Sequence, residues 1–123
     1  MKKVYYNKLV RDLIQAKIER RGEGYSIRTI EDPDEFEQEL LKKVTEEAAA
    51  LAAASSRQEF LSEYADLMVV LDALTHHLEF SEADIKTALA DNVEKKGFYK
   101  NRHFLHWSEA GDYKSNETPQ GLK

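Results

Sequence analysis

The sequence predicts an all-α fold, an antiparallel four-helix-type bundle with irregular N- and C-terminal segments. Three observations predict it. Apolar residues recur three and four positions apart, which is the spacing of one face of a helix. Helix-start signals at Asp32–Glu35, Ser56–Glu59 and Ser81–Asp84 divide the chain into segments of helical length. The links between these segments are short, which favours antiparallel neighbours.

Composition narrows the class of protein. The chain has 123 residues, of which 41% are hydrophobic and 33% charged, as in one globular domain. A net charge of −5 argues against binding to a nucleic-acid polymer. Cysteine is absent, which excludes disulfides, thiolate catalysis and cysteine-bound zinc. Neither a signal peptide nor a run of about 18 apolar residues is present, so we expect a cytoplasmic protein that does not enter a membrane.

The first helix is expected over residues 9–21, because Leu9, Leu13 and Ile18 recur at helical spacing. Gly22 ends it. The following ten residues are expected to form a loop, in which two alternating isoleucines give a weak strand signal.

The second helix is expected over residues 33–54. Asp32 is placed to cap it, and Pro33 suits its first position. An apolar stripe contains one acid, Glu47, in line with its hydrophobic members: Phe36, Leu40, Val44 and Leu51. The alanine-rich half, residues 48–54, allows another helix to approach closely, within a subunit or between subunits.

The third helix is expected over residues 57–78, after a capping serine at Ser56. Its predicted core residues are Phe60, Tyr64, Leu67, Val70, Leu71 and Leu74. A fourth helix starts at Ser81 and ends near Gly97. We expect the aromatic residues of 98–107 to pack back, which makes residues 1–107 one domain and residues 108–123 a flexible tail.

Acidic residues face one another across the predicted hairpin of helices two and three. Glu47 lies eight residues before Ser55, and Glu63 lies seven after Ser56, so the two are level. Asp66 shares a helix face with Glu63. Carboxylates brought together repel unless a cation is present, and oxygen ligands suit Mg²⁺, Mn²⁺ or Ca²⁺. The alternative is an ordinary solvated acidic face, which is common on helices.

These acids carry a resemblance to a known family. Glu46-Glu47 followed by Glu63-Tyr64-Ala65-Asp66 resembles the EExxE…ExxD signature of MazG-like all-α nucleoside triphosphate pyrophosphohydrolases, relatives of phosphoribosyl-ATP pyrophosphohydrolase. Residues 6–14, YNKLVRDLI, resemble the YNKLVRDxI opening of one bacterial subgroup. Residues 95–105 are similar to that subgroup's KRGGFxxRxFL-like end. The three patches occur in the family's order.

The resemblance implies Mg²⁺-dependent (or Mn²⁺-dependent) hydrolysis of a nucleoside triphosphate to the monophosphate and pyrophosphate. It implies metal ligands at Glu47, Glu63 and Asp66. We expect Glu46 to assist these ligands and, as a carboxylate not fully committed to the metal, to accept the proton. It also implies a homodimer or homotetramer, and a role in clearing the nucleotide pool.

One position departs from the family pattern. The acid expected three residues after Glu47 is replaced by Ala50. Water can complete a magnesium site, and Glu46 lies one turn earlier on nearly the same face. The alternative is a nucleotide-binding or assembly module that has lost turnover.

Basic residues flank the acidic hairpin. Lys8 and Arg11 are expected on one face at the start of the first helix, with Asn7 capping that helix or contacting the nucleobase. By chemistry alone they are ordinary surface residues, whereas the resemblance implies substrate contact. Polar residues at the end of the fourth helix also have two possible roles. The resemblance implies substrate contact, whereas by chemistry alone lysines there pair with the C-terminal end of the helix dipole. The residues concerned there are Asn92, Lys95 and Lys96.

Histidines give weaker signals. His76 and His77 point about 100° apart on a helix, so they make a poor joint metal site. His103 and His106 stand among aromatic residues, where packing is the expected role.

Overall fold

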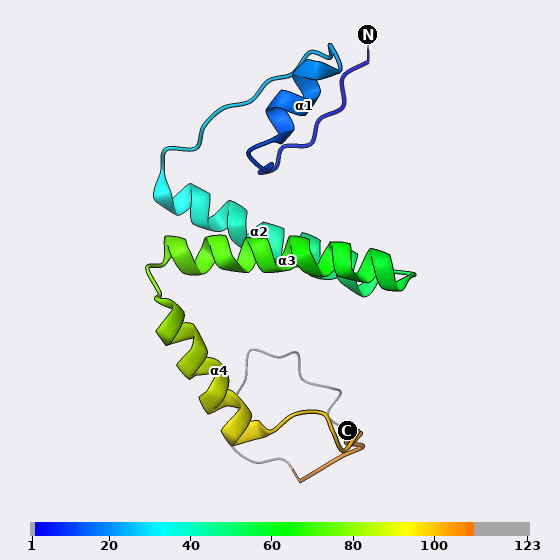
Figure 1. Cartoon of the computed structure of the whole chain (residues 1–123), viewed down its shortest axis with the longest axis vertical. Helices are drawn as coiled ribbons and strands as arrows, with labels where there is room; N and C mark the ends of the chain where they lie inside the picture. Colours follow the sequence, from blue (N-terminus) through cyan, green and yellow to red (C-terminus); the bar gives the residue numbers. More distant parts are fainter. Residues whose placement is uncertain (1, 110–123) are drawn as a thin grey trace. The chain divides into compact units, whose positions relative to one another are not determined.

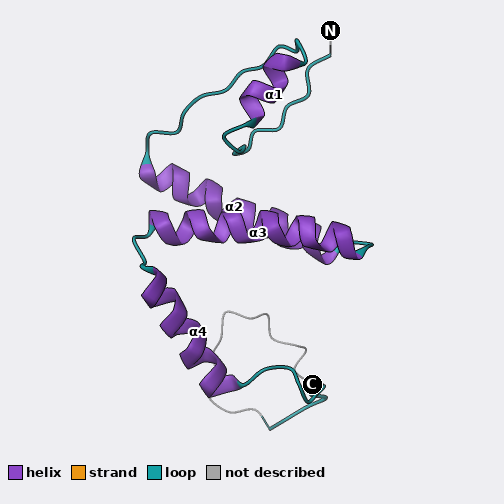
Figure 2. Ribbon diagram, viewed as in Figure 1, coloured by secondary structure: helices purple, strands orange, loops and turns teal. Residues whose placement is uncertain are grey.

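The computed structural model describes residues 2–109, which contain four α-helices and no strand (Figure 2). The predicted all-α class is therefore confirmed. The helices are α1 (Ile14–Arg20), α2 (Pro33–Ala52), α3 (Arg57–His77) and α4 (Glu82–Lys96). Contacts divide the chain into two compact units, residues 1–86 and 87–123. No helix in the described part is long and apolar enough to cross a membrane.

Helices α2 and α3 form an antiparallel hairpin, as predicted, and lie side by side (Figure 1). Each begins at the cap that the sequence indicates. The Asp32 side chain accepts a hydrogen bond from the Asp34 backbone N–H at 3.0 Å, and the Ser56 hydroxyl accepts one from that of Glu59 at 3.0 Å. Such caps satisfy N–H groups that have no partner within the helix.

The hairpin core is small. Leu40 of α2 is buried with Val70 and Leu74 of α3, and Phe36 and Val44 pack against this cluster. Farther along the pair, the His77 ring meets the edge of Phe36, with 5.2 Å between ring centroids. Phe60 and Tyr64, in the N-terminal half of α3, were also predicted to lie in the core, but they are 48% and 47% exposed.

Helix α1 is shorter than predicted, and residues 9–13 precede it. The physical reason is that Leu9 packs against the hairpin core instead of continuing the helical stripe. Lys8 and Arg11 therefore lie on an irregular segment, and the prediction that they share a helix face is wrong. Asn7 has a φ of 47° and caps no helix.

The loop between α1 and α2 contains no strand. Side chains hold it at both ends instead. The Tyr25 hydroxyl donates a hydrogen bond to Glu19 and accepts one from the Gln15 amide at 3.0 Å. Arg28 makes an ion pair of 2.5 Å with Glu35 in the first turn of α2.

Helix α4 begins with a reciprocal capping box between Ser81 and Asp84, at 3.1 and 2.9 Å. It ends before Gly97, whose φ of 75° is the left-handed conformation that stops a helix. Within the second unit the aromatic side chains of residues 98–107 are open, with Tyr99 95% and Trp107 80% exposed, and their packing against the rest of the chain stays a prediction. The aromatic contact there is local: Phe104 meets His106 at 5.2 Å. The predicted tail lies largely outside the described residues, and the single-domain assignment stays a prediction.

Candidate metal centre

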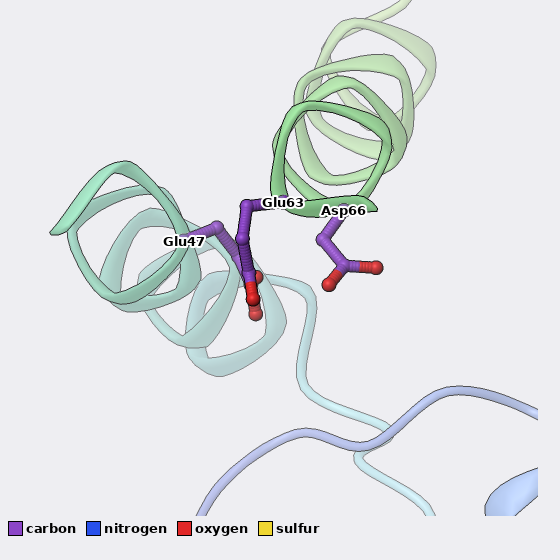
Figure 3. Close-up of side chains that lie close together, drawn as sticks. All are labelled: Glu47, Glu63 and Asp66. Carbon is purple, nitrogen blue, oxygen red and sulfur yellow. The ribbon is translucent and has the colours of Figure 1, made fainter. Parts of the chain in front are cut away.

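Three carboxylates converge at the middle of the hairpin. Glu47 comes from α2, and Glu63 and Asp66 come from α3, one helical turn apart. One oxygen from each lies within 4.8 Å of the others, and all three residues are half-buried. Figure 3 shows the three side chains pointing out of the hairpin on the same side. The register counted outward from the serine turn is therefore confirmed. We call these residues the acidic trio.

The acidic trio has the chemistry of a site for a hard divalent cation. Its donors are all carboxylate oxygens, which suit Mg²⁺ or Mn²⁺. Two ligands on one Mg²⁺ at about 2.1 Å lie at most about 4.2 Å apart. The three oxygens lie within 4.8 Å of one another, so only a small inward movement of the side chains brings them to such a spacing. The residues present therefore fit a magnesium-type ion, with water completing the coordination.

Ala50 occupies the position at which the pattern that the sequence resembles has a further acid. It lies on α2 one turn after Glu47 and is half-buried. A methyl group supplies no ligand, so the hairpin offers three carboxylates at this level.

The irregular segment before α1 brings one cation to the acidic trio and a second to the neighbouring Glu46. The Lys8 ammonium lies 2.9 Å from Glu46, and the Arg11 guanidinium lies 3.7 Å from Asp66. In sequence these pairs are 38 and 55 residues apart (46 − 8 and 66 − 11). Both predicted basic residues are thus beside the predicted acids, although the helix expected to carry them begins only after them.

Glu46 is held apart from the acidic trio. Its two oxygens pair with Lys8 at 2.9 Å and with Lys43 at 3.0 Å. These hydrogen bonds lower the pKa of Glu46, against a smaller opposing effect of burial, and the bond to Glu46 raises the pKa of Lys8. Glu46 does not join the group of acids whose oxygens converge. Its carboxylate is committed to cations of the chain itself.

Two lysines near the site were not predicted from the sequence. Lys43 is 14% exposed and lies 3.6 Å from Glu47 as well as 3.0 Å from Glu46. Its spacing of three and four from these acids was a readable signal. Lys17 lines a surface hollow together with Arg11, Leu13 and Asp66. That contact depends on the fold of the N-terminal segment and leaves no pattern in the sequence.

The remaining predicted site residues lie elsewhere. Asn7 is exposed and directly precedes Lys8. Asn92, Lys95 and Lys96 are exposed on the last turns of α4, in the second unit. Their approach to the acidic trio stays a prediction. Comparison of the chain with models of protein families, with curated proteins and with solved structures found no match in any of the three.

Proposed function

We propose that the protein is a nucleoside triphosphate pyrophosphohydrolase that uses Mg²⁺ or Mn²⁺. The observation that carries the proposal is the acidic trio with Lys8 and Arg11 beside it. A cation site next to two exposed cationic side chains suits a polyphosphate, whose charge is offset by a metal ion and by basic side chains together. The family resemblance in the sequence supports the same reaction class.

Each side chain has a distinct task in this proposal. Glu47, Glu63 and Asp66 hold the cation. A bound Mg²⁺ offsets phosphate charge and makes water more acidic. Arg11 turns from Asp66 to a phosphate oxygen, for which its planar fork is suited. Lys8 supplies a point charge to the phosphate tail, and Glu46 holds Lys8 in position.

The reaction balances without a further reactant. The oxygen of water bonds to the α-phosphorus while the bond from that phosphorus to the bridging oxygen breaks. The electron pair leaves with pyrophosphate, and the water proton passes to a base. Sequence reasoning assigned this base to Glu46. Its two lysine partners lower its pKa, which weakens a base, so we assign Glu46 to positioning Lys8.

Ala50 favours a second candidate function. A site with three carboxylates in place of four binds its cation less tightly, and slow turnover follows from low occupancy. The alternative is therefore a nucleotide-binding or assembly module without hydrolysis. Such a module would use the same basic residues and the same hairpin to bind a nucleotide. It would differ from the enzyme only in lacking the hydrolysis step.

Pyrophosphate release separates the two candidates. The protein is incubated with a panel of ordinary and damaged nucleoside triphosphates and with Mg²⁺ or Mn²⁺. We expect release with at least one substrate, lost in Glu63→Gln and kept in Asp72→Asn. Asp72 is an exposed acid of the same helix outside the trio, so it controls for loss of charge. Nucleotide binding without any release selects the module, and full activity of Glu63→Gln refutes the site.

A further inference from the structure

A surface hollow of about 420 Å³ adjoins the acidic trio. Its wall includes Asp66, which is also one of the trio, so the hollow begins where the candidate metal site ends. Pockets that hold small molecules have volumes of about 300–1,000 Å³. The hollow therefore has room for a part of the substrate beyond the phosphates. Its lining residues are Arg11, Asp12, Leu13, Ile14, Lys17 and Asp66.

The segment around the start of α1 supplies most of this lining in a fixed order. Arg11 stands at the metal end, because its guanidinium lies 3.7 Å from Asp66. The Ile14 backbone N–H donates to the Arg11 carbonyl at 3.1 Å, which turns the chain into α1. The Lys17 backbone N–H donates to the Leu13 carbonyl at 3.3 Å, so Lys17 lies one helical turn after Leu13. Along the chain, two apolar side chains thus separate the two cations of the hollow.

The lining of the hollow does not suit a phosphate group alone. Leu13 is 70% exposed and Ile14 is half-buried, so part of the wall is open apolar surface. Asp12 adds a negative charge, which repels phosphate. A nucleobase has the complementary chemistry, since its flat faces are largely apolar and its edges carry both hydrogen-bond donors and acceptors. The wall of the hollow therefore matches a base better than a phosphate.

Two charged side chains of the hollow are uncommitted. In the part of the chain that the structure describes, neither Asp12 nor Lys17 takes part in an ion pair. By contrast, the cations nearest the trio are all paired with acids, namely Lys8, Arg11 and Lys43. An ionised Asp12 only accepts hydrogen bonds, and a charged Lys17 only donates them. The hollow thus offers a ligand one strong acceptor group and one strong donor group.

We propose that the hollow holds the nucleobase of the substrate and that Asp12 and Lys17 select guanine. Guanine is the ordinary base whose edge carries two adjacent N–H donors beside a carbonyl oxygen. A carboxylate accepts two such donors side by side, and an ammonium group donates to the oxygen. Adenine offers one amino group beside a ring acceptor, which leaves part of the carboxylate unmatched. The inference rests on the proposed function, because the phosphates of the same nucleotide lie at the acidic trio.

Nucleotide binding tests the proposal without turnover. Calorimetric titration in the presence of Mg²⁺ uses the α,β-methylene analogues of GTP and ATP, in which the bond to be cleaved is blocked. We expect the unaltered protein to bind the GTP analogue roughly 5–150-fold more tightly, the range that corresponds to one good bidentate contact to a base. Equal affinity for the two analogues, or no binding of either, overturns the proposal.

Asp12→Asn should exchange the preferred base. The new amide puts a donor in place of one acceptor, so it no longer matches the amino group of guanine. It matches instead the oxygen that xanthine carries at that position. We expect the variant to lose its preference for the GTP analogue over the ATP analogue and to gain affinity for the xanthosine analogue. Asp72→Asn is the control, because it removes the same charge from an exposed position outside the hollow. An unchanged preference in Asp12→Asn contradicts the proposal.

Lys17→Met separates a base site from a phosphate site. It should weaken binding of the GTP analogue and leave binding of inorganic tripolyphosphate unchanged, whereas the control Arg20→Met should alter neither. Arg20 is an exposed cation of the same helix outside the hollow. Loss of tripolyphosphate binding in Lys17→Met would place the phosphate tail in the hollow and overturn the proposal.

Pyrophosphate release, measured separately, keeps the two proposals apart. A guanine preference that depends on Asp12 without any release supports the base site and refutes the proposed hydrolysis. Release without a guanine preference supports the hydrolysis and refutes the base site.

Discussion

The Arg11 guanidinium lies 3.7 Å from the Asp66 carboxylate, which is itself one of the three converging acids. Arg11 therefore acts as an internal counter-ion for the acidic trio. The contact is loose and both side chains are about half exposed, so it contributes little to stability. Arg11 is thus able to exchange Asp66 for a substrate phosphate.

Arg11→Gln is expected to separate metal binding from substrate use. The substitution removes a competitor for Asp66, so Mn²⁺ affinity should stay the same or rise. It also removes a charged hydrogen bond to phosphate, worth about 1.5–3 kcal/mol, so kcat/KM should fall roughly 10–100-fold. Electron paramagnetic resonance of Mn²⁺ and pyrophosphate release measure the two effects, and Arg11→Lys should restore part of the second. Weaker Mn²⁺ binding in Arg11→Gln would show that Arg11 supports the trio structurally.

Ala50→Glu tests whether a ligand position stands vacant. A carboxylate one turn after Glu47 should raise Mn²⁺ affinity by at least about tenfold, because even an outer partner of a metal ligand changes affinity by that much. Ala49→Glu is the control, since it adds the same charge to an exposed neighbouring position. Calorimetric titration compares the two variants. Equal affinities would mean that water or another group already completes the site.

Leu40→Ala is expected to destabilise the first unit. Leu40 is 6% exposed in a cluster of three buried residues, so the lost contacts and the cavity should cost about 2–5 kcal/mol. Leu13→Ala removes the same atoms at a position that is 70% exposed and should cost less than about 1 kcal/mol. Urea unfolding at a fixed protein concentration gives both values. Similar losses would indicate that the core lies elsewhere.

The Arg28–Glu35 pair predicts an acid-dependent loosening of the loop before α2. The hydrogen bond from Arg28 lowers the pKa of Glu35 below its unfolded value. A lowered carboxyl pKa stabilises the folded state above the unfolded pKa of about 4.3 and loses this effect as pH falls through the folded pKa. Protection of the amides of residues 28–35, taken relative to their intrinsic exchange rate at each pH, should therefore fall in acid. Glu35→Gln should lack this protection already at neutral pH, and an unchanged pH profile of protection in this variant would remove Glu35 as the cause.

The sequence predicted the parts of the site that follow from helical geometry. Glu47 and Glu63 are level because the serine turn fixes the register, and Asp66 follows because it lies one turn from Glu63. The start of α1 was predicted wrongly. Leu9 has the spacing of a helical stripe, but its side chain packs against the hairpin core, and spacing alone does not distinguish the two. The pairing of Lys8 with Glu46 also joins residues far apart in the sequence. Spacing alone had placed Glu46 beside the metal, whereas its carboxylate pairs with Lys8.

The central claim is that Glu47, Glu63 and Asp66 form a cation site. Its most direct test is a Mn²⁺ titration of the wild type, Glu63→Gln and Asp72→Asn. The account predicts one Mn²⁺ per chain for the wild type and for Asp72→Asn, and at least about a tenfold loss of affinity in Glu63→Gln. Equal Mn²⁺ affinity in Glu63→Gln and the wild type would contradict it.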